Sequence, residues 1–175
     1  MSDQLIEESG MTFGPYPSDL CFYIEKSETY RHIRKKIKIA EFLLLRKKPE
    51  KTAIWVIEAK SSSPKEENRQ NFDDFIAEIR EKFVNAFSLG WSCCLGRHLI
   101  AEGELPEDFK DLDLARSDVR FILVINGHRD SWLPPLQDAL NIAMNSTVRT
   151  WAFAPASVAV INDKMARQHG LICPE

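Results

Sequence analysis

One segment, residues 52–60 (TAIWVIEAK), constrains the fold of this chain more than any other. Its β-branched and aromatic residues favour a strand. The neighbouring residues 37–46 (IKIAEFLLLR) are continuously apolar in their later part, as expected for a strand that is covered on both faces. After residue 60 the apolar period becomes that of a helix, because Phe72, Ile79 and Phe83 belong to a stripe with three- and four-residue spacing. The segment is therefore expected to lie inside a sheet with a helix packed against it.

Similar patterns predict the remaining elements. Further strands are expected at residues 20–25, 37–46, 118–126, 148–153 and 158–161, and helices at residues 64–90, 132–144 and 162–169. Residues 1–19 are expected to form an irregular lead-in, and residues 102–117 a surface loop. This order predicts an α/β fold with a mixed central β-sheet flanked by helices, in a single domain spanning residues 1–175.

The composition limits the class of protein. The 175 residues carry a net charge of −3, whereas a dedicated non-specific nucleic-acid binder is usually basic. A nucleic-acid enzyme of this charge would need local basic patches or a partner subunit. No apolar run is long enough for a membrane helix, and the polar start lacks the layout of a signal peptide, so a cytoplasmic location is expected. The spacing of the four cysteines matches no zinc motif.

Two charges close the segment at residues 52–60. Glu58 and Lys60 point to the same side of a strand, with Cα atoms about 6.5–7 Å apart. Burying such charges needs a partner, either a metal ion or a third charged group. Glu41 is the candidate, because it interrupts an apolar strand that a short link would pair beside the first. Carboxylate oxygens of this kind suit Mg²⁺ or Mn²⁺.

These residues resemble the PD-(D/E)XK nuclease superfamily. An acidic residue on one strand, a hairpin, and Glu-x-Lys on the next strand followed by a helix is its arrangement, and EAKSS is typical of its central strand. The resemblance covers about residues 20–126 and implies a restriction-endonuclease-like fold. It implies that Glu41 and Glu58 bind the metal together with the backbone carbonyl of Ala59. It also implies that Lys60 orients or deprotonates the attacking water. The usual Pro-Asp pair is replaced here by Ala40-Glu41.

The resemblance implies a metal-dependent nuclease, an endonuclease or exonuclease acting on DNA or, less in keeping with the family, on RNA. By association it implies a subunit of a microbial defence or mobile-element system that works with protein partners or as a homodimer. The alternative is a catalytically degenerate nuclease-like subunit that binds or scaffolds within a larger complex. Gln70 and Glu25 are candidates for supplementary site residues.

Each of these residues also has a purely structural interpretation. Glu58 and Lys60 could form an ion pair at a strand end, and Glu41 could lie on a solvated face. Gln70 could be an ordinary helix-surface residue. The basic segments 31–38 and 46–48 could contact phosphate or could be solvated turns.

Overall fold

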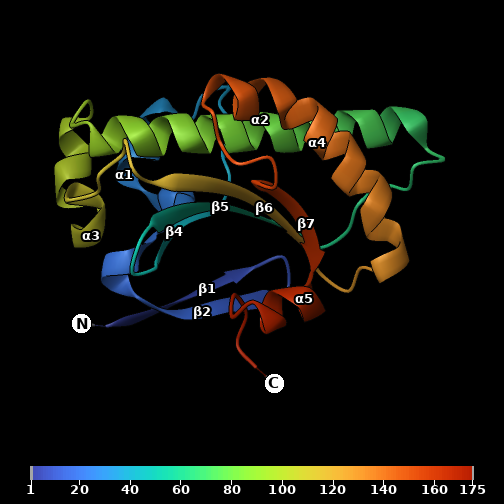
Figure 1. Ribbon diagram of the computed structural model, residues 1–175, viewed down its shortest axis with the longest axis horizontal. Coiled ribbons are helices and arrows are strands. Elements are labelled where there is room, and N and C mark those ends of the chain that lie inside the picture. The colour runs from blue at the N-terminus through green and yellow to red at the C-terminus, as the bar shows by residue number, and fades with distance from the viewer. Residues whose placement is uncertain (1, 175) are drawn as a thin grey trace.

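Five strands form the central sheet of the computed structural model, which describes residues 2–174 (Figure 1). In their order across the sheet they are β3 (Cys21–Phe22), β4 (Phe42–Lys47), β5 (Thr52–Lys60), β6 (Asp118–Ile125) and β7 (Val158–Asn162). Strand β4 runs antiparallel to its two neighbours, β3 and β5. Strands β5, β6 and β7 run parallel to one another. The predicted α/β fold with a mixed sheet flanked by helices is therefore confirmed.

Strand β5 has the bounds that its sequence predicts, and it lies in the middle of the sheet. Ile57 is paired with Phe42 of β4 on one side and with Ile122 of β6 on the other. Its side chains alternate between two separate apolar clusters, since Val56 packs on one face and Ile57 on the other. The continuous apolar run of β5 thus reflects burial on both faces.

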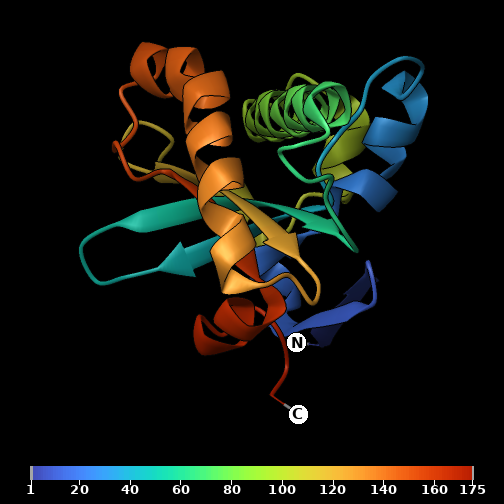
Figure 2. The ribbon, with the colours of Figure 1, turned by 90° about the vertical axis from the view of Figure 1, so that its right-hand side faces the viewer.

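Two long helices cover one face of the sheet. They are α2 (Arg69–Cys94) and α4 (Leu133–Thr150), which lie above the strands in Figures 1 and 2. Phe83 of α2 and Leu140 of α4 are fully buried against the sheet in one apolar cluster. The apolar stripe predicted from the sequence is thus the buried side of α2. The shorter helices are α1 (Glu28–Ile33), α3 (Glu107–Lys110) and α5 (Asp163–Gln168), with 3-10 turns at Ser18–Leu20, Ile24–Lys26, Leu99–Gly103 and Asp130–Trp132.

The opposite face is covered by α5 and by an antiparallel hairpin of β1 (Asp3–Glu8) and β2 (Met11–Pro17). Ser9 and Gly10 form its two-residue turn, both with positive φ, as tight hairpin turns require. The prediction of an irregular lead-in at residues 1–19 is wrong. Gly14, Pro15 and Pro17 obscured the pattern, yet proline is tolerated in a hairpin that has free edges.

Several predicted boundaries are also wrong. Strand β4 begins at Phe42 rather than at residue 37, and the strand predicted at 20–25 shrinks to β3 followed by a 3-10 turn at Ile24–Lys26. The predicted loop at 102–117 contains α3. Helix α4 continues to Thr150 and occupies part of the strand predicted at 148–153. Apolar spacing alone did not separate a short strand from the last turn of a helix.

Helix α2 begins at Arg69, later than the predicted start at Pro64, and continues past the predicted cap at Gly90. Gly90 packs against the sheet instead. A Cβ atom at this position would lie 2.4 Å from Leu43 Cδ1. The glycine therefore permits close helix–sheet contact rather than ending the helix. None of the helices described in residues 2–174 is long and apolar enough to cross a membrane.

Candidate active site

Glu58 lies near the end of β5 and is fully buried, with 0% of its side chain exposed. Its carboxylate faces α2, because it shares a strand face with Val56. Lys82 of α2 donates a hydrogen bond to Glu58 Oε1 at 2.7 Å, and Lys60 Nζ lies 3.3 Å from the same oxygen. Burial raises the pKa of Glu58, while the two ammonium groups act in the opposite direction. The structure thus gives the buried acid two cationic partners.

The charges continue outward from Glu58 as an alternating chain. Lys60 Nζ donates to Glu78 Oε1 at 3.1 Å, and Lys38 Nζ donates to Glu78 Oε2 at 3.0 Å. The hydrogen bonds from Lys38 and then Lys60 hold the pKa of Glu78 below its usual range. The Lys60 side chain is 24% exposed, so its ammonium group joins the buried acid to the solvent-facing end of the chain.

Glu41 is held just before β4 by backbone hydrogen bonds on both sides. Its N–H donates to the Ile57 carbonyl at 3.0 Å, and its own carbonyl accepts from the Glu25 N–H at 3.2 Å. Extending the alternation of β4 by one residue places Glu41 on the α2 face, where the charges of Glu58 and Lys82 act on its carboxyl. Glu41 is 6% exposed, so it does not lie on a solvated face.

Three acidic side chains from distant segments meet at Glu41. The carboxylate oxygens of Glu8, Glu25 and Glu41 lie within 4.8 Å of one another. Glu8 ends β1 and accepts a short hydrogen bond from the Tyr23 hydroxyl, and Lys26 Nζ lies 3.2 Å from Glu25 Oε2. Carboxylates this close repel one another unless one is protonated or a cation lies between them.

Burial and then the charges of Glu58, Glu25 and Glu8 raise the pKa of Glu41 to about 9. Its Oε2 is buried and has no hydrogen-bond partner among the described residues, and the same is true of Glu58 Oε2. Each of these oxygens therefore retains lone pairs that no protein group satisfies, as an oxygen that could take a cation would.

The backbone carbonyl of Ala59, a predicted metal ligand, faces the β1–β2 turn. Ser9 Oγ donates to it at 3.0 Å, and Asn126 Nδ2 donates to the Ser9 carbonyl at 3.1 Å. This turn is what carries Glu8 to the site. A carbonyl oxygen has two lone pairs, so the bond from Ser9 leaves one acceptor position.

The structure brings together part of the predicted set of site residues. Glu41, Glu58 and Lys60 are brought to one face, and Glu25 joins them, whereas Gln70 Nε2 donates to Asp74 on the surface of α2. Lys82 and Glu8 were missed. Lys82 directly precedes the buried Phe83, and the sequence does not distinguish it from a solvated lysine at the edge of the apolar stripe. The Ser9-Gly10 pair was the signal of the hairpin that delivers Glu8.

The two predicted basic segments differ in how far they are engaged within the protein. Arg31 pairs with Glu28, and Arg46 donates to the carbonyls of His169 and Gly170 while it lies over Trp55. Arg34 and Lys35 are exposed and have no ion pair with a described residue. The segment at 46–48 is thus bound mainly to the protein itself, whereas all the basic side chains of the segment at 31–38 are exposed to solvent.

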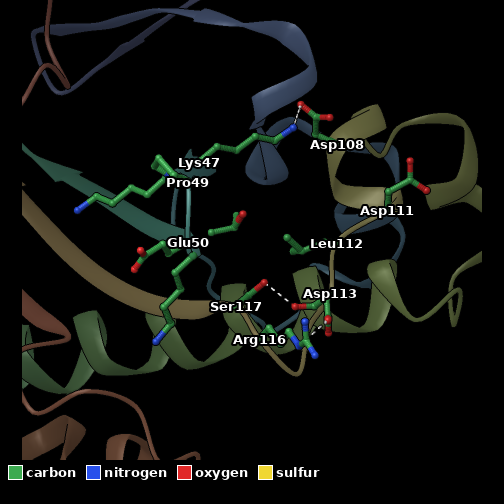
Figure 3. Close-up of a pocket in the computed structure, with 12 residues that line it drawn as sticks. Lys47, Pro49, Glu50, Asp108, Asp111, Leu112, Asp113, Arg116 and Ser117 are labelled. Carbon is green, nitrogen blue, oxygen red and sulfur yellow. Dashed lines mark hydrogen bonds and ion pairs between the residues drawn. The ribbon is translucent and has the colours of Figure 1, made fainter.

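A cavity of about 430 Å³ lies at the other end of β5, between the β4–β5 turn and residues 108–117 (Figure 3). Its wall mixes both charges, and Lys47 Nζ pairs with Asp108 at 2.8 Å. Because opposite charges neutralise one another here, the cavity has no concentration of positive charge that would bind a phosphate. Comparison of the chain with protein-family models, curated proteins and solved structures gave no match.

Proposed function

We propose that this chain is a metal-dependent nuclease of restriction-endonuclease-like fold that hydrolyses phosphodiester bonds in DNA. The observation that carries the proposal is the burial of Glu41 and Glu58 on one face of the sheet, with Lys60 beside Glu58. The topology supports it, because an antiparallel meander of β3, β4 and β5 is followed by α2 and then by β6 parallel to β5. The superfamily core has the same order of meander, helix and strand.

The donor set fits Mg²⁺ or Mn²⁺, which take carboxylate and carbonyl oxygens. Glu41 and Glu58 each have a buried oxygen without a hydrogen-bond partner among the described residues, and Glu25 and Glu8 add carboxylates beside Glu41. These side chains and the Ala59 carbonyl would hold the ion. When bound, it would polarise a phosphate oxygen and lower the pKa of a water molecule.

The lysines have separate roles. Lys60 is the more exposed of the two lysines that contact Glu58, so its ammonium group would orient the attacking water and stabilise negative charge that develops on the phosphate. Lys82 is ion-paired with the buried acid and, among the described residues, with no other carboxylate, so it would act as a positioning residue. Because Lys82 binds Glu58 Oε1, the other carboxylate oxygen of Glu58 would be left to face the metal.

The test is cleavage of DNA by Lys60→Ala and Glu58→Gln variants in Mg²⁺ or Mn²⁺. Both changes should abolish cleavage while the thermal unfolding midpoint shows that the protein remains folded. Lys38→Ala is the matched control, because the Lys38 ammonium group ends the same charge chain and pairs with Glu78 rather than with Glu58. Cleavage that persists in both site variants removes the assignment.

One observation favours the second candidate, a catalytically degenerate nuclease-like subunit that binds or scaffolds. Both cationic partners of Glu58 converge on a single oxygen, so the protein itself compensates much of that buried charge. Calorimetric titration with Mn²⁺ distinguishes the two functions. Binding that depends on Glu41 supports the nuclease, whereas no binding at millimolar Mn²⁺ supports the subunit. In either case a protein partner or a second copy, within a microbial defence or mobile-element system, belongs to the proposal.

A further inference from the structure

A second group of side chains lies at the end of the sheet that carries Lys60. The loop after β5 and the loop after β6 leave the sheet side by side there, because the Asn126 N–H donates to the Lys60 carbonyl at 2.9 Å. Ser63 Oγ and His128 Nε2, 3.2 Å apart, join the two loops further out. The carboxyl ends of parallel strands are where α/β proteins commonly bind ligands.

Trp132, at the start of α4, gathers two cations from these loops. Lys65 Nζ lies 5.0 Å from the centre of its ring and Arg129 Cζ lies 4.9 Å from it. Both cations are exposed, and neither has a carboxylate partner in the part of the chain that the structure describes. Glu66 and Glu67 also line the cavity beside Lys65, so the charge of this region is mixed, and the two cations stand out because they have no ion pair with a described residue.

A cavity of about 210 Å³ adjoins the same indole. Its apolar wall contains Phe72 of α2 and Leu136 of α4, both members of the cluster that covers the Glu58 face of the sheet. His128 and Ser131 supply polar groups at the cavity. The volume is below the range of about 300–1,000 Å³ typical of drug-sized ligands, so the cavity suits one planar ring system.

We propose that Trp132, Lys65 and Arg129 bind one nucleotide of a single-stranded substrate, with its phosphate on the two cations and its base in the adjoining cavity. Aromatic and guanidinium planes stack on bases of any sequence, and paired cations hold the backbone. The identity of the ligand as nucleic acid rests on the proposed function. Arg129 is three residues from Asn126, a reach of at most about 11 Å, so this nucleotide lies close along the strand to the phosphate at Lys60.

The test is binding of a short fluorescein-labelled single-stranded DNA, followed by anisotropy in EDTA so that no cleavage occurs. Trp132→Ala should weaken binding by about 5- to 150-fold, and Trp132→Phe should retain most of it. Lys65→Ala/Arg129→Ala should also weaken binding and reduce the slope of log affinity against log salt by about 0.7 to 1.4. Arg97→Ala/Arg149→Ala removes two exposed positive charges near the ends of α2 and α4 that lie away from Trp132, and should change neither quantity.

Wild-type affinity for Trp132→Ala or for the Lys65/Arg129 pair overturns the proposal, as does an equal loss in the control pair. Trp132→Leu keeps the apolar contact without the aromatic plane, so it replaces Trp132→Ala if that variant unfolds. Cleavage in Mg²⁺ is measured in parallel. A chain that binds through Trp132 but cleaves nothing refutes only the nuclease, and one that cleaves without needing Trp132 refutes only this nucleotide site.

Discussion

Glu41→Gln should stabilise the metal-free protein at neutral pH, although it removes a predicted ligand. The pKa of Glu41 is raised from 4.5 to about 9 in the folded state, by burial and by three neighbouring carboxylates. The folded protein therefore holds more protons at this site than the unfolded chain does. Its free energy of unfolding falls as the pH rises from about 4.5 towards about 9. Glutamine has no such ionisation and avoids this loss.

The magnitude follows from the two pKa values. In this pH range Glu41 is ionised in the unfolded chain but protonated in the folded protein, so at about 1.36 kcal/mol per pH unit the wild type should lose up to about 4 kcal/mol between about pH 5 and about pH 8. Urea unfolding in EDTA at several pH values, for wild type and Glu41→Gln, measures this difference. Glu67→Gln, which changes an exposed glutamate in the same way, is the control and should show no such trend.

A free-energy difference between wild type and Glu41→Gln that stays constant across this pH range would refute the argument. Mn²⁺ supplies a second check. A divalent cation replaces the proton on Glu41, so its apparent affinity should rise by up to about tenfold per pH unit below about pH 9. Millimolar Mn²⁺ should raise the unfolding midpoint of the wild type more than that of Glu41→Gln.

Three further predictions concern stability. Lys82→Met should lower the free energy of unfolding by about 3 kcal/mol, or the unfolding midpoint by about 6–12 °C, because Glu58 loses its closer cationic partner. Glu58→Gln in the same chain should recover most of this loss, and additive effects of the two changes would contradict the reasoning. Gly90→Ala should cost about 1 kcal/mol through its contact with Leu43, and calorimetry should find the change stabilising instead in a Leu43→Val background. Gly10→Ala should cost about 1–2 kcal/mol in urea unfolding, since its φ is +75°. It should also weaken Mn²⁺ binding in calorimetry by displacing Glu8, and an unchanged Mn²⁺ affinity would show that the turn does not position a metal ligand.

The sequence was most informative where one physical rule dominated. The apolar residues of β5 and the apolar stripe of α2 had to be buried, so both elements were predicted. The short link between the two strands also predicted that Glu41 would lie close to Glu58. The contribution of Glu8 could not be predicted in the same way. It depends on a hairpin packed against the far side of the sheet, and nothing local to residues 1–19 encodes which strand end its turn will meet.

Lys82 illustrates the same limit for an ion pair. A lysine at the edge of an amphipathic helix is commonly solvated, since its long stem lets the charge reach water. Only the register between α2 and β5 turns it inward onto Glu58. Gly90 was mistaken for a helix end because the sequence cannot show that Leu43 approaches it. Contacts between distant elements decided each of these cases.

The hairpin that delivers Glu8 is itself fastened to the far end of the chain. Gly14 N–H donates to the Leu171 carbonyl, and Cys173 Sγ donates to the Gly14 carbonyl, 159 positions away along the sequence. Residues leave the ribosome in sequence order, so β2 cannot make these two contacts until Leu171 and Cys173 have been synthesised. A partly synthesised chain would therefore carry Glu25, Glu41 and Glu58 while the hairpin that bears Glu8 still lacks these two contacts.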